Sequence, residues 1–536
     1  MERRPVMIKK VFSSKLIPLI LLVCLFLIII FTVFVEANDY GITMDEPMQN
    51  SYGHLVLSWY TSLGKDNSFL QYNSDGYLPG HGPFFEVIVA VAQKIFGHEW
   101  YTRAVVNGLA GVIGVIAIAL CGYELGGYWL AFVAGLFLWL YPRIFGSIFN
   151  NSKDIPFAAA MTLILWAVLM LISQWNYKRR YVRNSILVGL FLGMAIAIRA
   201  TAIIWYFMLL FIVACWCLTG LTKTIDRQKM ISALKRQVIS ALLIGVISFL
   251  TIMVLWPYIF LNPIRHLHES IVVIQRFPWN GPVLFNGRIY HAESLPLSYI
   301  LVWLVIGSPL IIIIFTLFGF LLPLGRSIKA RALDPQAAIV YMALVVPVAL
   351  MIVLHATLYD GQRQFFFLIP VMILIAAYGF LSLCDQLLLR QQLLARILLA
   401  VLIVSTCISY LFIIKSMRDI HPYEYSYFNA LVGGVPGANG KYDTDYWRIC
   451  SKPAAEWLGN NYQKFTNKQN PTATSFPIPI LALLYLPGSF KEDNTNPDFY
   501  IGSTKDHFDQ RFPNYRIIHT ESINGQVPVC VIKMKT

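Results

Sequence analysis

The stretch LIPLILLVCLFLIIIFTVFV, residues 16–35, contains no charged residue and decides the class of fold. A helix needs about 20 apolar residues to cross a bilayer, and this stretch is that long. Val35-Glu36-Ala37 loosely resembles a signal-peptide cleavage site, but the apolar run exceeds the roughly 7–15 residues usual in signal peptides. The stretch is therefore predicted to be an uncleaved membrane anchor. Five basic residues precede it: Arg3, Arg4, Lys9, Lys10 and Lys15.

The composition of the whole chain agrees with that of a membrane protein. Of its 536 residues, 57% are hydrophobic and 13% are charged, against about 25% charged in an average soluble protein. The mean hydropathy is +0.61. These values exclude a disordered chain and an ordinary soluble enzyme. The net charge of +14 is interpreted as basic cytoplasmic loops rather than as a nucleic-acid-binding surface.

Further apolar segments bring the expected number of spanning helices to about 11. They lie at 104–122, 128–147, 155–174, 184–199, 200–219, 238–258, 297–322, 337–355, 365–384 and 397–415. Basic residues cluster after the fourth, sixth, eighth and tenth spans, which puts those loops on the same side as the N-terminus. This pattern predicts a cytoplasmic N-terminus and an extracytoplasmic C-terminus.

Two domains are predicted, a membrane module over residues 1–415 and a soluble α/β domain over 416–536. Within the outer loop 36–103, Met48–Leu63 and Phe84–Phe96 have the amphipathic pattern of two interfacial helices. In the tail, Lys452–Tyr462 reads as a helix, and Asp498–Thr504 and Arg516–Met534 read as strands. Asn524-Gly525 is a strong hairpin signal. The fold class is thus an α-helical polytopic membrane protein with a small soluble C-terminal domain.

Two carboxylates open the first outer loop, in Thr43-Met44-Asp45-Glu46-Pro47. A carboxylate held beside a bound hydroxyl is able to act as a general base. The alternative is a helix start, with Asp45 as the N-cap and Pro47 in the first turn. The local sequence leaves both interpretations open.

A second polar cluster, Asn150-Asn151-Ser152-Lys153-Asp154, forms the outer turn between the third and fourth spans. Polar groups at membrane depth are costly and are functional candidates by default. The cluster favours hydrogen bonding to a polar ligand, although Asp154 could instead cap the following helix.

A third cluster, Tyr359-Asp360-Gly361-Gln362-Arg363, precedes the tenth span. The guanidinium fork of Arg suits phosphate. The alternative role for Arg363 is anchoring to lipid headgroups.

Isolated candidates are scattered along the chain, and neither histidine among them has the spacing of a metal site. They are His81, Glu86, Arg103, Arg143, Arg199, Arg276, Arg288 and His355. No dinucleotide fingerprint, phosphate-cradling loop, metalloprotease motif or nucleophile elbow occurs in the sequence.

These elements together resemble the GT-C class of membrane glycosyltransferases, and within it the bacterial branch of the protein O-mannosyltransferase and aminoarabinose-transferase superfamily. The matching elements are Thr43–Pro47, Asn151–Phe157 and Leu358–Arg363, joined by His421–Asn429 and Asp445-Tyr446-Trp447 in the tail. The resemblance covers residues 1 to about 460. It implies sugar transfer from a polyprenyl-phosphate carrier to a hydroxyl acceptor, a lipid, glycan or protein, on the outer face of a bacterial inner membrane.

The resemblance also implies roles for residues of this chain. Asp45 matches the family's base, while Glu46 and Asp154 would orient the acceptor or the sugar. A phosphate leaving group needs stabilisation by preorganised cations rather than a general acid. A single displacement would invert the anomeric configuration. The predicted substrate-binding residues are Lys153, Arg363, Arg199, Arg276, Arg288, Asn151, Asp360, His81 and Glu86.

Several expectations stay open. No metal or other cofactor is expected by default. A divalent metal is the alternative, and His81 is the residue that suggests it. Gln364 stands where the family often has a His after the Arg, which leaves the donor's identity open. The alternatives to an active transferase are a flippase or transporter of lipid-linked substrates, or an inactive paralogue acting as an assembly factor. Cys450 and Cys530 either form a disulfide in an oxidising compartment or remain two separate buried thiols.

Overall fold

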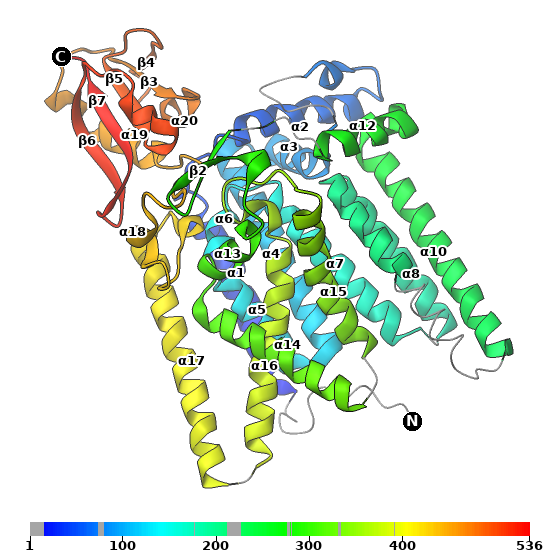
Figure 1. Ribbon diagram of the computed structural model, residues 1–536. Coiled ribbons are helices and arrows are strands. Elements are labelled where there is room, and N and C mark those ends of the chain that lie inside the picture. Colours follow the sequence, from blue (N-terminus) through cyan, green and yellow to red (C-terminus); the bar gives the residue numbers. More distant parts are fainter. Residues whose placement is uncertain are drawn as a thin grey trace.

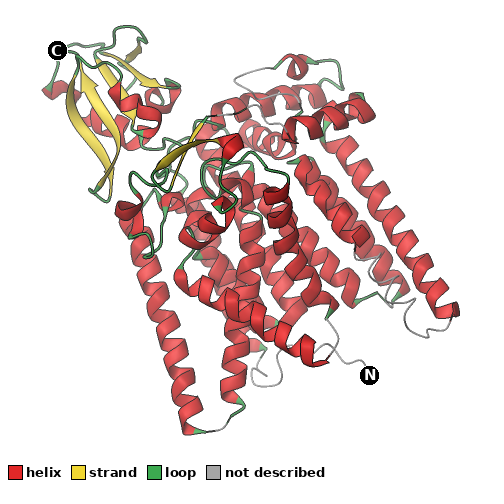
Figure 2. Ribbon diagram, in the orientation of Figure 1, coloured by secondary structure: helices red, strands yellow, loops and turns green. Residues whose placement is uncertain are grey.

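The computed structural model describes residues 15–72, 80–175, 177–211, 227–275, 279, 281–330, 334–390 and 392–536. A bundle of long helices carries a layer of shorter helices across one end (Figure 1). A small sheet domain sits at that same end, and strand is confined almost entirely to it (Figure 2).

Seven helices in the described ranges are long and apolar enough to cross a membrane, and one bent helix pair brings the number to eight. The chain is therefore a multi-pass membrane protein with a mostly helical fold. The seven are α1 (Leu16–Glu36), α4 (Glu99–Gly126), α7 (Asp154–Ser173), α10 (Arg227–Leu255), α15 (Pro335–Val353), α16 (Leu368–Leu388) and α17 (Leu393–Ile420).

Two predicted spans are broken rather than continuous. The segment 128–147 divides into α5 (Tyr128–Trp139) and α6 (Pro142–Ser147), with Pro142 at the first turn of the second helix. The segment 297–322 divides into α13 (Tyr299–Ile306) and α14 (Leu310–Ala330), which meet at 117°. Proline disfavours helical backbone in the residue before it, so Pro142 and Pro309 account for both breaks.

The remaining predicted spans are helical where they are described. The segment 184–199 lies largely in α8 (Lys178–Ile196), which begins at its basic flank. The segment 200–219 starts with the 3-10 turn η2 (Ala200–Ile203) and an apolar helix reaching Phe211, and its remainder lies outside the described residues. Eleven crossings stay a prediction, because length and composition alone identify fewer.

Close helix packing in the bundle depends on paired glycines between α14 and α16. A Cβ atom on Gly379 would lie 2.2 Å from the Phe315 carbonyl oxygen, and one on Gly319 would lie 2.1 Å from the Ile375 carbonyl oxygen. Small residues let membrane helices approach backbone to backbone. The two glycines therefore fix the distance between these helices.

Both amphipathic segments of the first outer loop are helical, as predicted. They form α2 (Glu46–Thr61) and α3 (Phe84–Phe96), joined through the 3-10 turn η1 (Ser68–Gln71). With α11 (Pro257–Leu261) and α12 (Pro263–Gln275) they belong to the outer layer (Figure 1). The strands β1 (Pro282–Phe285) and β2 (Arg288–His291) form an antiparallel hairpin, followed by the 3-10 turn η3 (Ala292–Ser294).

The tail does not separate from the helices at residue 415. Helix α17 continues to Ile420, and the chain after it packs against α6 through η5 (Glu424–Ser426) before it forms the short helix α18 (Gly434–Ala438). A Cβ on Gly146 would lie 2.3 Å from the Tyr425 backbone nitrogen. The Arg143 Nε donates to the Tyr427 carbonyl oxygen at 2.7 Å. Residues 421–449 are thus physically part of the membrane module.

The terminal domain is a five-stranded mixed sheet in the order β4-β3-β5-β7-β6. Strand β3 is parallel to β4 and β5, whereas β7 is antiparallel to β5 and β6. Its elements are α19 (Ser451–Asn461), η6 (Tyr462–Lys464), β3 (Thr472–Phe476), α20 (Ile480–Leu483), β4 (Lys491–Glu492), β5 (Phe499–Ser503), η7 (Lys505–Gln510), β6 (Arg516–Ile523) and β7 (Val527–Met534).

The predicted helix, the predicted strands and the hairpin of this domain are confirmed. The hairpin turn has positive φ at both Asn524 (48°) and Gly525 (65°), as a tight two-residue turn requires. Cys450 and Cys530 form a disulfide with a Cα–Cα distance of 5.8 Å, so the alternative of two separate thiols is wrong. This disulfide joins Cys530 of β7 to Cys450, which lies between residues 421–449 and the start of α19.

Candidate active site

Three of the predicted polar clusters meet at one small cavity at the outer-layer end of the bundle. The cavity is small, with a volume of about 20 Å³. The start of α2, the turn before α7, the turn before η2, the 3-10 turn η4 (Arg363–Phe365) and the chain after α18 supply its walls. Its lining residues are Thr43, Asp45, Gln49, Asn150, Asn151, Lys153, Asp154, Arg199, Arg363 and Trp447.

Asp45 and Arg363 form an ion pair at the cavity, although they are far apart in the sequence. The Asp45 Oδ2 lies 2.9 Å from the Arg363 Nη1, and the two side chains are 29% and 8% exposed. Asp45 immediately precedes α2, which fixes its position at the helix start. Its carboxylate makes no capping bond to that helix, so it is directed to the ion pair rather than to the role of N-cap.

Arg363 is held by a second carboxylate and two aromatic rings. The Asp360 Oδ2 lies 3.5 Å from its Nη1, and the rings of Tyr359 and Trp447 lie 4.9 and 5.5 Å from its Cζ. Burial lowers the pKa of Arg363, but the adjacent Asp45 and Asp360 carboxylates outweigh this and raise it. Burial also raises the pKa of Asp360 to about 6, although Arg363 opposes the shift. The guanidinium therefore stays charged.

Asp154 and Arg199 form a second ion pair on the cavity wall, with 2.6 Å between Asp154 Oδ1 and Arg199 Nη2. The Asn151 side chain fixes this carboxylate. Its Nδ2 donates to Asp154 Oδ2 at 3.0 Å, and its Oδ1 accepts from the Asp154 backbone N–H at 2.8 Å. Asn151 thus supplies the side-chain bond at the start of α7. The alternative prediction that Asp154 caps this helix is wrong, because its carboxylate instead pairs with Arg199.

Lys153 and Asn150 complete the polar wall. Burial lowers the pKa of Lys153 to about 7, with a further lowering by the Arg199 guanidinium and an opposing effect of Asp154. The Asn150 side chain is buried, and within the described residues neither its Oδ1 nor its Nδ2 has a hydrogen-bond partner. A buried amide without partners is costly. The Asn150 Oδ1 and Nδ2 are therefore available to hydrogen-bond a polar group in the cavity.

The predicted site residues Glu46 and Glu86 do not line the cavity. Both contact Arg103, which is fully buried: its Nε lies 3.1 Å from Glu46 Oε1 and its Nη1 lies 2.8 Å from Glu86 Oε2. The other Glu46 oxygen accepts from the Thr43 backbone N–H at 2.7 Å. Burial raises the pKa of Glu46 to about 7, opposed by Arg103. The two glutamate side chains thus lie behind the cavity wall and bind Arg103, and the catalytic and substrate-binding roles expected for them stay predictions.

The same arginine connects the two glutamates to the cavity wall. Its Nη2 donates to Gln49 Oε1 at 3.1 Å and to Ser152 Oγ at 2.6 Å. Ser152 Oγ in turn donates to Gln49 Oε1 at 2.7 Å. Arg103 therefore connects α2 with the turn that carries Lys153 and Asp154.

Of the three other predicted residues, the two that the structure describes, His81 and Arg288, do not line the cavity. The Tyr52 hydroxyl donates to the backbone carbonyl oxygen of His81 at 3.5 Å. Arg288 is exposed on β2, and Arg276 lies outside the described residues. Among the described side chains, no group of three or more His, Cys, Asp or Glu could hold a metal ion. Metal independence itself stays a prediction.

Sequence reasoning does not identify four of the cavity-lining residues, Thr43, Gln49, Asn150 and Trp447. Gln49 lies one helical turn after Asp45, so helical spacing was a usable signal. Thr43 and Asn150 belong to two of the predicted polar clusters, but an uncharged side chain there carries no signal that separates it from a loop residue. Trp447 reaches the cavity from the distant tail, and no local sequence pattern predicts that contact.

Comparison with solved structures identifies the class of fold. ArnT from Cupriavidus metallidurans bound to undecaprenyl phosphate is similar with a TM-score of 0.50 and 13% identity, over 96% of this chain and 97% of that one. The apo oligosaccharyltransferase of Archaeoglobus fulgidus gives a TM-score of 0.53 and 14% identity, over 89% of this chain and 64% of that one. No protein-family model and no curated protein sequence matches the chain.

Both neighbours are GT-C membrane glycosyltransferases. This chain therefore has the GT-C fold, with a small sheet domain at its C-terminus. The identities are too low to carry more than the fold.

Proposed function

We propose that this protein is a membrane glycosyltransferase that moves a sugar from a polyprenyl-phosphate carrier to an acceptor hydroxyl. One observation carries the proposal: two carboxylates and three basic side chains converge on a single small cavity at one end of an apolar helix bundle. A lipid-linked donor has its tail in the bilayer and its phosphate and sugar near the membrane surface. A cavity at the end of the bundle suits that geometry.

Asp45 is the proposed general base. An acceptor hydroxyl that attacks the anomeric carbon must lose its proton, and a carboxylate within hydrogen-bond reach is able to accept it. Asp45 is the more exposed of the two cavity carboxylates, at 29% against 5% for Asp154. Asp154 is held by Asn151 and Arg199 and is better suited to orienting the sugar. The transfer is a single displacement, in which the new glycosidic bond forms as the bond to phosphate breaks, with inversion.

Lys153, Arg199 and Arg363 are the proposed phosphate-binding residues. Three cations face two carboxylates in the cavity, so its formal charge is +1 when Lys153 is protonated. The departing phosphate carries the negative charge that develops as the bond breaks, and preorganised cations stabilise it. An arriving phosphate also offsets the repulsion between Lys153 and Arg199, which favours the protonated amine.

The proposed location is the inner membrane of a bacterium, with the N-terminus in the cytoplasm and the cavity and sheet domain outside. The basic loops support this orientation. The Cys450–Cys530 disulfide supports it too, because such bonds persist in oxidising compartments.

The test uses purified protein in detergent and a panel of polyprenyl-phosphate sugars, with membrane extract as the source of acceptor. Free polyprenyl phosphate is quantified by mass spectrometry for the wild type, Asp45→Asn and Asp154→Asn. The matched control is Asp419→Asn, which removes a carboxylate of an exposed ion pair on α17. Sugar-dependent release is expected from the wild type and control, and not from Asp45→Asn. No release with any donor would reject the transferase and favour a flippase or an inactive paralogue.

A further inference from the structure

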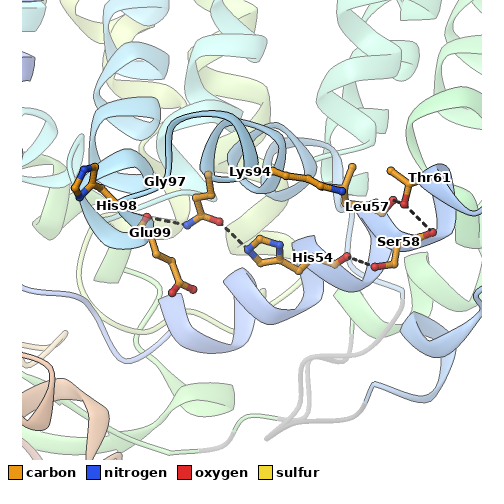
Figure 3. Close-up of a pocket in the computed structure, with 9 residues that line it drawn as sticks. His54, Leu57, Ser58, Thr61, Lys94, Gly97, His98 and Glu99 are labelled. Carbon is orange, nitrogen blue, oxygen red and sulfur yellow. Dashed lines mark hydrogen bonds between the residues drawn. The ribbon is translucent and has the colours of Figure 1, made fainter.

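A groove distinct from the catalytic cavity opens in the outer layer between α2, α3 and the start of α4 (Figure 3). Its volume of about 480 Å³ lies within the range of roughly 300–1,000 Å³ typical of ligand sites. The polar side chains that line it and enter the argument are those of His54, Ser58, Thr61, Gln93, Lys94 and Glu99.

Most of the lining residues have polar side chains, and Leu57 is the one apolar side chain among the described residues, although polar and apolar atoms share the exposed surface of the groove about evenly. The apolar residues of α3 that are exposed, Ile88, Val91 and Ile95, recur at helical spacing and are not part of the lining. The groove therefore does not suit a lipid tail.

The floor of the groove is built from buried, hydrogen-bonded groups. Gln93 is 7% exposed. Its Nε2 donates to Asn50 Oδ1 and to the Glu99 carbonyl oxygen, both at 2.8 Å. Its Oε1 lies 2.9 Å from His54 Nε2, and the Asn50 Nδ2 donates to Glu99 Oε1 at 2.6 Å. These bonds hold the lining side chains in place before any ligand arrives.

The floor is continuous with the support of the catalytic cavity. Asn50 Oδ1 also accepts from Arg103 Nη1 at 3.3 Å, and Arg103 donates to the cavity-lining Gln49. The two sites lie along one helix: nine residues separate His54 from Asp45, or about 13 Å at 1.5 Å per residue. An extended oligosaccharide is able to span that distance.

We propose that this groove binds a saccharide portion of the acceptor, which names the acceptor class for the proposed transferase and so rests on that function. A sugar hydroxyl both donates and accepts hydrogen bonds. The Ser58 hydroxyl donates to the His54 carbonyl oxygen at 3.1 Å and the Thr61 hydroxyl to the Leu57 carbonyl oxygen at 3.1 Å, so both oxygens face a ligand as acceptors. Lys94 donates and Glu99 accepts. An isolated phosphate gives the Glu99 carboxylate no hydrogen-bond donor, whereas the hydroxyls of a neutral or an acidic saccharide supply one. The groove is then a subsite that holds the acceptor chain while its terminal hydroxyl reaches Asp45.

The test is a binding titration on the full-length protein in detergent, without donor. The probes are maltotriose, which is neutral, tri-galacturonic acid, which is acidic, and inorganic phosphate. At least one saccharide is expected to bind. The double variant Ser58→Ala/Lys94→Met is expected to weaken that binding about tenfold, the effect of losing about two hydrogen bonds. The control is Lys65→Met, an exposed lysine outside the groove.

The two saccharide arms distinguish a neutral from an acidic acceptor. The proposal is overturned if neither saccharide binds up to its solubility limit, if the double variant binds as the wild type does, or if phosphate alone binds. Because the titration contains no donor, its outcome is independent of donor cleavage, so failure of the groove and failure of the transferase are separate results.

Discussion

Arg103 lies behind the cavity wall, where it pairs with Glu46 and Glu86. Replacing it with Met is expected to lower the free energy of unfolding strongly. The side chain is fully buried and bonds five partners: Glu46, Glu86, Gln49, Asn50 and Ser152. Methionine fills a similar volume but leaves the Glu46 and Glu86 carboxylates buried without a cation. Breaking a buried ion pair by removing one partner costs about 3–5 kcal/mol. The free energy of unfolding should fall by about that amount at pH 8.

The pH dependence of the same variant is a second, independent signature. Burial raises the pKa of Glu46 in the folded protein from 4.5 to about 7, with Arg103 opposing the shift. The folded state therefore keeps a proton that the unfolded state loses, and stability falls as pH rises from about 4.5 through 7, by about 3 kcal/mol. Without Arg103 this pKa rises further. The cost of Arg103→Met should thus be smaller at pH 5 than at pH 8.

The assay is reversible unfolding in mixed micelles, followed by circular dichroism at both pH values. The matched control is the triple variant Arg103→Met/Glu46→Gln/Glu86→Gln, which removes the carboxylates together with the cation. It should recover much of the lost stability at pH 8. A cost below about 1 kcal/mol for the single variant, or a triple variant no more stable than the single one, would refute the reasoning.

Three further outcomes are expected. Polyprenyl phosphate should bind more weakly as pH rises through about 7, where Lys153 loses its proton. The Lys153→Gln variant should flatten this pH dependence of the affinity. A variant with the same pH dependence as the wild type would contradict the role of the amine. The Cys450→Ser/Cys530→Ser pair should lower stability by about 2–5 kcal/mol, measured by thermal unfolding and matched by reduction of the wild type; equal melting temperatures would reject a structural disulfide. Gly379→Ala should cost about 1–3 kcal/mol by overpacking against the Phe315 carbonyl, and an unchanged unfolding free energy would show that α14 and α16 separate freely.

Much of the fold follows from local sequence. Apolar length identifies the helices, and the amphipathic spacing of residues 48–63 and 84–96 locates α2 and α3. The Asn524-Gly525 turn locates the final hairpin. The breaks at Pro142 and Pro309 were missed because hydropathy alone treats each long apolar run as one helix. Strand β3 was missed because its sequence, Thr472–Phe476, is short and lacks a clear alternation.

The candidate site is only partly local. Asp45, Lys153 and Asp154 stand out because charge at the end of an apolar segment is costly. The arginines that pair with the two aspartates, Arg363 and Arg199, come from distant turns, and only the tertiary fold shows which arginine meets which carboxylate. Adjacent residues also diverge in role: Asp45 lines the cavity, whereas Glu46 is turned toward Arg103 by the first turn of α2. No local pattern separates these two carboxylates.

The most direct test of the central claim compares the affinity for polyprenyl phosphate with turnover in two variants. Asp45 occupies Arg363 Nη1 at 2.9 Å, where it competes with phosphate for the guanidinium. Asp45→Asn should therefore tighten phosphate binding about fivefold, the change that about 1 kcal/mol produces, while it abolishes sugar transfer. Arg363→Ala should weaken binding and transfer together. Sustained transfer by Asp45→Asn, or unaltered phosphate binding by Arg363→Ala, would contradict the account.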